Sequence, residues 1–179
     1  MTLPLAPGTY QLDPLHSQIG FTVTHLSLTP VRGLFPEFAG TLQVGERLDD
    51  VVLEVCIRML SVQSGHPGRD EHIQNPDFFH SEIHPDMTFR STSVSEAGEG
   101  WIVDGDLTVK GTSQSVRLET TMTGRKVFPL DEKEHVGFVA RGLLIRSTFG
   151  VAVGVPADML SDDIAIEIAA QLVAVEEPG

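Results

Sequence analysis

The side chains best able to do chemistry in this chain are its histidines, four of which fall between residues 66 and 84. His80 and His84 lie four residues apart, a spacing at which two metal ligands can share one face of a helix. Pro76 and Pro85 interrupt the segment, however, so we do not expect a continuous helix that presents both ligands. HExxH and cysteine-based ligand patterns do not occur in the sequence. We therefore expect solvated loop histidines, and we predict no metal ion and no cofactor.

Two other histidines flank a predicted strand near the N-terminus. His25 shares a strand face with Phe21, so an inward imidazole could form a hydrogen bond with a ligand head group such as a quinone carbonyl. His16 follows the turn signal Asp13-Pro14 and is expected near one end of the fold. For both histidines the alternative is a ring whose hydrogen bonds are satisfied by the backbone or by a neighbouring hydroxyl group.

Three cationic side chains are candidates for contacts with an anionic group. Lys110 and Arg146 each end a predicted strand, where they could reach the pyrophosphate or carboxylate head group of a ligand. For Lys110 the main alternative is simple solvation. Arg69 and Asp70 are predicted to form a local ion pair at the start of a short helix, where an acidic side chain suits the helix dipole.

Nucleophilic catalysis is not indicated by the sequence. Cys56 is the single cysteine, and because it lies between Val55 and Ile57 we expect a small residue of the core or the barrel wall. GxSxG, GxGxxG and GxxxxGK[ST] patterns do not occur, so neither a serine nucleophile nor a nucleotide site is supported. An enzyme would need an acid–base set, such as His25 with Asp13 or Arg146. We predict that the protein is not an enzyme and keep that set as the alternative.

Alternating apolar and polar residues predict the sheet that must position these side chains. Ile19, Phe21 and Val23 share one strand face, with polar residues between them, which is typical of a half-buried strand. The same alternation or a strand-like composition recurs in residues 10–13, 38–44, 53–59, 87–94, 101–109, 116–122, 137–145 and 164–175. Turn signals separate these runs at residues 45–46, 97–100, 110–112 and 123–124.

Two stretches break the strand pattern. Residues 65–79 are expected to hold a short helix that ends before Pro76, and residues 28–35 to hold a turn of helix. Many strands with hairpin-length turns predict a meandering antiparallel sheet, which avoids exposed edges by closing into a barrel. We predict an all-β protein: a single domain over residues 1–179, with a core of about residues 9–175, that forms one β-barrel with one or two short helices.

Composition narrows the class of partner. The formal charge is −13, and an acidic chain is repelled by nucleic acid and by anionic membrane surfaces. A single cysteine allows no intrachain disulfide bond, and no apolar run is long enough to predict a transmembrane segment. The first eight residues lack the basic and apolar regions of a secretory signal. We therefore predict a cytoplasmic protein that does not bind nucleic acid.

A series of short motifs carries a resemblance to a known family. They are residues 10–17 (YQLDPLHS), 21–26 (FTVTHL), 31–35 (VRGLF), 38–40 (FAG), 69–73 (RDEHI), 77–79 (DFF), 84–91 (HPDMTFRS), 105–111 (GDLTVKG) and 146–150 (RSTFG). In order and spacing they are similar to the YceI-like, polyisoprenoid-binding family. The resemblance implies an extended, eight-stranded antiparallel barrel of lipocalin-like shape, with an interior tunnel and no catalytic activity.

The resemblance also implies a ligand. It is a long apolar or amphiphilic lipid, such as a polyisoprenoid or an isoprenoid quinone, held by a carrier, storage or sensing protein. We predict ligand contacts at His16, Ser17, Phe21, Val23, His25, Phe35, Phe38, Phe78, Phe79, Phe89, Leu107, Arg146 and Phe149. The alternatives are an enzyme that acts on a small apolar substrate in the same pocket, and a ligand-free stress or interaction protein whose barrel is filled by side chains. Related barrels often pair, so a homodimer is a further prediction.

Overall fold

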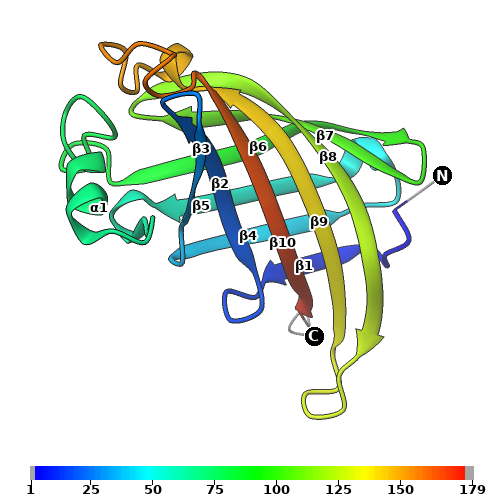
Figure 1. Cartoon of the computed structure of the whole chain (residues 1–179). Coiled ribbons are helices and arrows are strands. Elements are labelled where there is room, and N and C mark those ends of the chain that lie inside the picture. The colour runs from blue at the N-terminus through cyan, green and yellow to red at the C-terminus, as the bar shows by residue number, and fades with distance from the viewer. Residues whose placement is uncertain (1–2, 176–179) are drawn as a thin grey trace.

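The computed structural model describes residues 3–175, in which ten antiparallel strands form one continuous sheet (Figure 1). The stretches with alternating residues are strands, and the predicted stretch 38–44 coincides with β4 (Phe38–Val44). The other strands are β1 (Gly8–Leu12), β2 (Gln18–His25), β3 (Thr29–Leu34), β5 (Val52–Arg58), β6 (Asp86–Ala97), β7 (Gly100–Val109), β8 (Thr112–Val127), β9 (Glu134–Ile145) and β10 (Asp163–Val175).

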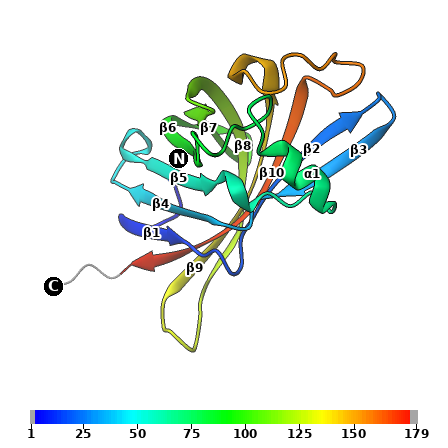
Figure 2. The same ribbon diagram turned by 90° about the vertical axis from the view of Figure 1, so that its left-hand side faces the viewer.

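Eight of these strands close into a barrel. They follow the order β1-β4-β5-β6-β7-β8-β9-β10, and pairing between β10 and β1 completes the ring. The hairpin of β2 and β3 is not part of the ring. It continues the sheet from β10 and extends one end of the barrel (Figure 2). The predicted eight-stranded antiparallel barrel is therefore confirmed, with one hairpin added to it.

The hairpin branches from the ring at Gln171 in β10. On one edge, β10 pairs with β2 up to Ala169 and with β1 from Leu172 onwards. Between these two partners, the backbone N–H of Gln171 donates to Ser17 Oγ at 2.9 Å. The Gln171 carbonyl accepts from the backbone N–H of Asp13 at 2.8 Å. The segment that joins β1 to β2 thus supplies hydrogen bonds to the backbone of Gln171, which lies between the residues of β10 that pair with β2 and those that pair with β1.

In residues 3–175, one α-helix and three short 3-10 helices lie outside the sheet. The predicted short helix is α1 (Pro67–Ile73), and it ends before Pro76 as expected. His66 caps it, because the ring Nδ1 accepts the backbone N–H of Arg69 at 3.2 Å. The 3-10 helices are η1 (Leu48–Asp50), η2 (Met59–Ser61) and η3 (Arg146–Phe149). None of the helices in residues 3–175 has the length and apolar character needed to cross a membrane.

The prediction of a helical turn in residues 28–35 is wrong, because this segment forms β3. The backbone N–H of Leu28 donates to the carbonyl of His25 at 3.0 Å, and Leu26 and Ser27 between them have φ angles of 52° and 53°. Positive φ at both central residues is the geometry of a tight two-residue hairpin turn, which folds β3 back on β2. Pro30 is tolerated because β3 is an edge strand.

The turn predicted at residues 123–124 is also wrong. Both residues lie inside β8, where the register against β9 shifts between Met122 and Gly124. Gly124 has a φ of 153°, which side chains with a Cβ rarely adopt, and a glycine inside a strand commonly marks such a bulge. The signals at residues 45–46, 97–100 and 110–112 do lie between strands, as predicted.

Replacing Ser17 with alanine tests the branch. The Ser17→Ala variant leaves the half-buried N–H of Gln171 without its acceptor, so the free energy of unfolding should fall by about 1–3 kcal/mol in a chemical denaturation experiment. Ser115→Ala on the exposed face of β8 is the matched control and should change the stability by less than about 0.5 kcal/mol. Equal stabilities of the two variants would contradict the role of the hydroxyl group.

The carboxylate of Asp13 makes the branch sensitive to acid. Burial tends to raise the pKa of Asp13, but hydrogen bonds from the His16 ring and the Leu15 N–H outweigh it and lower the pKa below its ordinary value. A depressed folded-state pKa stabilises the protein above the unfolded-state pKa of about 4, and this contribution is lost as the pH falls further.

The unfolding free energy of the wild type should therefore decline more steeply between about pH 5 and pH 2 than that of Asp13→Asn or His16→Ala. Denaturation curves recorded across this range measure the difference. Parallel pH profiles for the three proteins would show that Asp13 carries no such linkage.

Candidate ligand-binding site

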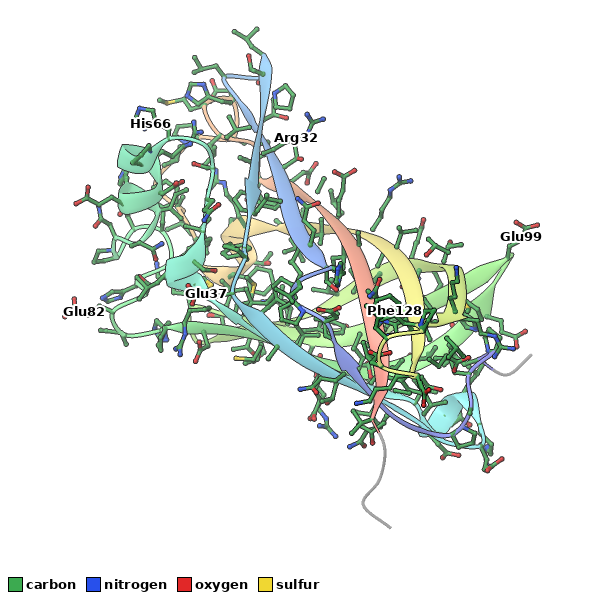
Figure 3. All side chains as sticks on the ribbon, turned by 90° about the horizontal axis from the view of Figure 1, so that it is seen from below. Arg32, Glu37, His66, Glu82, Glu99 and Phe128 are labelled. Atoms are coloured by element: carbon green, nitrogen blue, oxygen red, sulfur yellow. The ribbon has the colours of Figure 1, made fainter. Side chains whose placement is uncertain are left out.

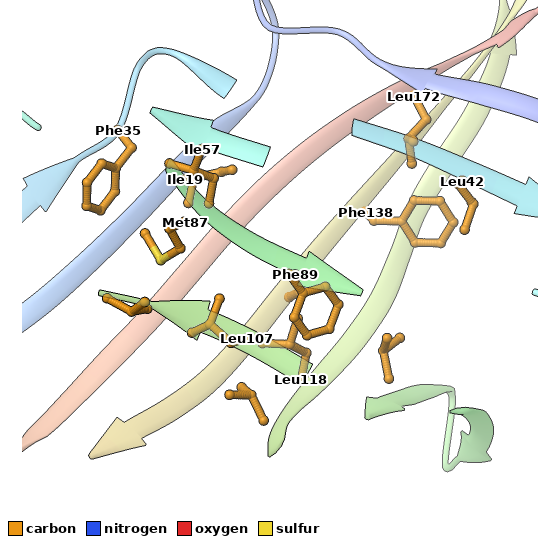
Figure 4. Close-up of a cluster of buried hydrophobic side chains, with 14 of the residues drawn as sticks. Ile19, Phe35, Leu42, Ile57, Met87, Phe89, Leu107, Leu118, Phe138 and Leu172 are labelled. Carbon is orange, nitrogen blue, oxygen red and sulfur yellow. The ribbon is translucent and has the colours of Figure 1, made fainter. Parts of the chain in front are cut away.

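The inner face of the barrel encloses an apolar cavity of about 640 Å³. Its size falls within the range of small-molecule sites, roughly 300–1,000 Å³. Every strand of the ring contributes to the wall, and in Figure 4 side chains such as Phe89, Leu118 and Phe138 come from different strands and share this interior. On β10 the lining side chains alternate: Ile164, Ile166, Ile168, Ala170 and Leu172.

Small residues keep this interior open. A Cβ at Gly105 would lie 2.4 Å from the ring of Phe89, and a Cβ at Gly33 would lie 2.3 Å from the ring of Phe21. Each glycine thus lets an aromatic ring lie against the strand that carries the glycine. Ala140 occupies an inward position on β9 and lines the cavity with only a methyl group. A Cβ at either glycine would displace the neighbouring ring, and both rings line the cavity.

Among the described residues, the cavity is exposed at one end, which we call the mouth. The lining residues that are exposed all gather there, on the β2–β3 hairpin, α1 with the loop that follows it, and the loop after η3: His25, Arg69, His72, Asp77 and Met159. At the opposite end, Val51, Val94, Trp101 and Val103 are each at most 9% exposed. We call this the closed end.

The two ends are well separated. His66, beside the mouth, and Glu99, in the turn before Trp101, lie at opposite ends of the molecule (Figure 3). Trp101 and Val109, eight residues apart on β7, both line the cavity. Eight residues of strand span about 26 Å, or about 20 Å along the axis of a barrel with the usual strand tilt. The cavity is therefore a tunnel long enough for an extended chain.

Most of the predicted ligand contacts lie on the wall of this tunnel. The lining includes Ser17, Phe21, Val23, His25, Phe35, Phe78, Phe79, Phe89, Leu107, Arg146 and Phe149. The structure brings these residues together from both halves of the chain. The tilted rings of Phe21, Phe35 and Phe79 form a connected row, with centroids 5.5 and 6.0 Å apart.

Two predicted contacts lie outside the lining. His16 is an exposed residue whose Nδ1 is 2.7 Å from the carboxylate of Asp13, so its role is in the branch between β1 and β2. Phe38 is half-buried at the start of β4 and packs against the core instead of facing the tunnel. His16 lies in the turn between β1 and β2, and Phe38 is the first residue of β4. Neither side chain is part of the cavity wall.

Arg146 lines the tunnel, but its guanidinium group binds backbone carbonyls. A guanidinium group carries five N–H donors. Nε donates to the backbone carbonyl of Ser161 at 3.1 Å. Nη1 donates to the carbonyls of Val151 at 3.1 Å and Ala152 at 2.5 Å. Nη2 donates to the carbonyls of Val155 and Leu160, both at 2.8 Å.

All five donors of Arg146 are therefore engaged, and the predicted contact with an anionic head group is not available to them. The side chain is 6% exposed, and its hydrogen bonds hold residues 146–161 around it. Asp162 lies 4.0 Å from Nε, and its carboxylate accepts hydrogen bonds from the Oγ and the backbone N–H of Ser147. Arg146 is thus the centre of the loop that forms one side of the mouth.

The other cationic candidates also hold loops together. Lys110 Nζ donates to the carbonyls of Pro76 and Gly150, at 2.7 and 2.9 Å, and so links the loop after α1 to η3 rather than being free in solvent. Arg69 and Asp70 do not form the predicted ion pair with each other. Both bind Ser64: Arg69 Nε donates to Ser64 Oγ at 2.7 Å, and the Ser64 hydroxyl donates to the Asp70 carboxylate.

His25 does not form the acid–base set that the sequence analysis considered. His25 lies at the mouth, whereas Asp13 is bonded to His16 and all donors of Arg146 are engaged, so the acid–base set considered from the sequence is not formed. The rings of His80 and His84 are 6.0 Å apart. Within residues 3–175, no three His, Cys, Asp or Glu side chains are grouped as metal ligands.

Sequence reasoning missed part of the wall. Trp101 lines the closed end, and Val155, Met159 and Leu160 line the mouth. The alternation in residues 101–109 places Trp101 on the same strand face as Val103, although Trp101 is not among the predicted ligand contacts. The mouth residues lie in an irregular loop without periodicity, so no sequence signal placed them.

The fold and the site define a class of protein: a lipocalin-like barrel with an apolar tunnel that opens at one end. A family model described as a YceI-like domain matches residues 10–172, so the chain belongs to the YceI-like family, as the motifs predicted.

Several relatives are similar over most of their length. The chain is 33% identical to protein YceI of Escherichia coli O17:K52:H18 over 147 residues, which are 79% of this chain and 75% of that protein. It is 30% identical to the crystal structure of the Campylobacter jejuni YCEI protein, with a TM-score of 0.77 over 86% of this chain and 90% of that one. A polyisoprenoid binding domain from Saccharophagus degradans shares the fold at 13% identity, with a TM-score of 0.66 over 93% and 98% of the two chains.

Replacing Arg146 tests the loop that it organises. Arg146→Met removes five donors from buried or half-buried carbonyls, so the free energy of unfolding should fall by about 3–5 kcal/mol in chemical denaturation. Arg141→Met, on the exposed outer face of the preceding strand β9, is the matched control and should cost less than about 0.5 kcal/mol. A loss of less than about 1 kcal/mol at Arg146 would contradict this role.

Proposed function

We propose that the protein binds one long apolar or amphiphilic lipid, such as a polyisoprenoid or an isoprenoid quinone, with its chain inside the barrel. The observation that carries this proposal is the tunnel, which is lined almost entirely by apolar side chains and opens at one end. The polyisoprenoid binding domain from Saccharophagus degradans, which shares the fold, supports the same class of ligand.

The physical basis is the transfer of a hydrocarbon chain out of water. Burial stabilises each methylene group by roughly 0.8 kcal/mol, so a chain of many carbons gains a large driving force from the wall alone. A hollow apolar interior also lacks the contacts of a close-packed core, and a ligand supplies them. These terms favour long chains over small polar molecules.

We propose binding rather than catalysis as the activity. The tunnel wall carries apolar side chains where an enzyme would need a converging acid, base or nucleophile. The alternative of a ligand-free barrel filled by its own side chains does not fit a cavity of about 640 Å³. Carrier, storage and sensing proteins share this binding step, and the homodimer and the cytoplasmic location stay predictions.

The single tryptophan provides a direct assay, because Trp101 lines the closed end of the tunnel. A ubiquinone with a long isoprenoid tail should quench its fluorescence in a saturable titration with a stoichiometry of one ligand per chain. Native mass spectrometry of the purified protein should show a co-purifying apolar molecule. Protein that is free of lipid and gives no saturable quenching would overturn the proposal.

Filling the tunnel tests where the lipid lies. Ala140→Phe places a ring in the lumen and should weaken ubiquinone binding at least tenfold, which corresponds to about 1.4 kcal/mol. Val139→Phe is the matched control, because the neighbouring residue is exposed on the outside of the same strand, and its binding should stay within twofold of the wild type. Equal affinities of the two variants would place the lipid elsewhere.

A further inference from the structure

The closed end of the tunnel contains a buried hydrogen-bond donor that the protein leaves unpaired. Trp101 is 9% exposed, and among the described residues its Nε1 has no hydrogen-bond partner. An indole N–H can only donate, and buried polar atoms are normally paired because an unmade hydrogen bond is costly. Gln74 Oε1 is the other unpaired buried side-chain atom in residues 3–175, but Gln74 does not line the tunnel.

The surroundings of Trp101 offer little to this donor. The ring of Phe138 stands edge-on at 72° with its centroid 6.5 Å away, so it is at most a weak acceptor. Val51, Val94 and Val103 are apolar. Two polar residues are register partners of Trp101: Thr120 on β8, which also lines the tunnel, and Glu96 on β6, which is exposed and is not part of the tunnel wall.

The mouth shows the opposite pattern, because its polar groups are already satisfied. Arg146 is fully engaged by backbone carbonyls, Arg69 binds Ser64, and His72 lies 3.5 Å from the carboxylate of Asp77. Arg69, His72 and Asp77 are exposed, so water also forms hydrogen bonds with them. The buried donor in the tunnel that lacks an acceptor, Trp101 Nε1, therefore lies at the closed end.

We propose that the lipid enters with its oxygen-bearing end first and that the indole N–H of Trp101 donates a hydrogen bond to that oxygen. This inference rests on the proposed lipid-binding function and adds an orientation to it. In the complex this oxygen lies at the closed end, beside the indole of Trp101 and the hydroxyl group of Thr120, which line the same part of the wall. The hydrocarbon chain then runs back along the tunnel towards the mouth.

The same geometry selects the class of head group. The charged residues on the wall, Arg69, Asp77 and Arg146, all lie at the mouth, so a charged head at the closed end would lose its hydration without gaining a counter-ion. A neutral carbonyl, hydroxyl or ether oxygen meets the single donor without that cost. Quinones, prenols, amides and esters therefore fit, whereas polyprenyl phosphates do not fit in this orientation.

Nitroxide-labelled lipids test the orientation on the intact protein. The probes are the methyl esters of 5-doxylstearic and 16-doxylstearic acid, whose nitroxide groups lie near the ester end and near the chain end. At saturation the 5-doxyl ester should quench Trp101 at least threefold more strongly than the 16-doxyl ester. Equal quenching or the reverse order overturns the orientation alone. If neither probe is immobilised in its electron paramagnetic resonance spectrum, the proposed function itself fails.

A second experiment isolates the hydrogen bond. Trp101→Phe keeps an aromatic ring and removes the N–H, so the affinity for the 5-doxyl ester, measured by its resonance spectrum, should fall about three- to tenfold. Squalene has no oxygen, and its affinity, measured by displacement of the bound probe, should stay within twofold of the wild-type value. Equal losses for both ligands would show that only packing changed, and an unchanged ester affinity would show that Trp101 does not bind the oxygen.

Discussion

The architecture depends on how β10 divides one edge between two partners. Gln171 stands at the division, with its backbone bonded to Ser17 and Asp13 instead of to a strand. On one side of this point the ring closes through β1, and on the other side the β2–β3 hairpin extends the sheet away from the ring. The branch therefore places the β2–β3 hairpin beside the mouth, where His25 lines the tunnel.

A hollow interior is unusual for a protein of this size, since cores are close-packed and each missing contact weakens dispersion attraction. The ring offsets this deficit with backbone hydrogen bonds between each pair of neighbouring strands around its circumference. The apolar wall offers water few hydrogen-bond partners. The cavity therefore stays dry and available for a hydrocarbon chain. The stability of the fold and its capacity to bind a lipid thus come from the same closed sheet.

The mouth shows how cationic side chains can build a binding site without contacting a ligand. Arg146 binds five backbone carbonyls, and Lys110 binds two more across neighbouring loops. These loops have no strand partners, so their carbonyls require donors from side chains. The positive charges that suggested an anionic head group are therefore used to shape the mouth, which leaves Trp101 at the far end as the unpaired donor in the tunnel.

The sequence by itself determined the all-β class, most strand positions and the inward residues on the regular strands, because a period of two encodes which side chains face one interior. It also predicted α1, because proline and capping signals act locally.

Tertiary structure alone decided the rest. Strand β3 exists because it pairs with β2 despite Pro30. His16 binds Asp13 in the turn between β1 and β2, and Arg146 binds carbonyls of the irregular loop that follows it. Local patterns specify faces and turns, whereas an irregular loop has no periodicity, so the partners of Arg146 are fixed only when that loop folds around the side chain.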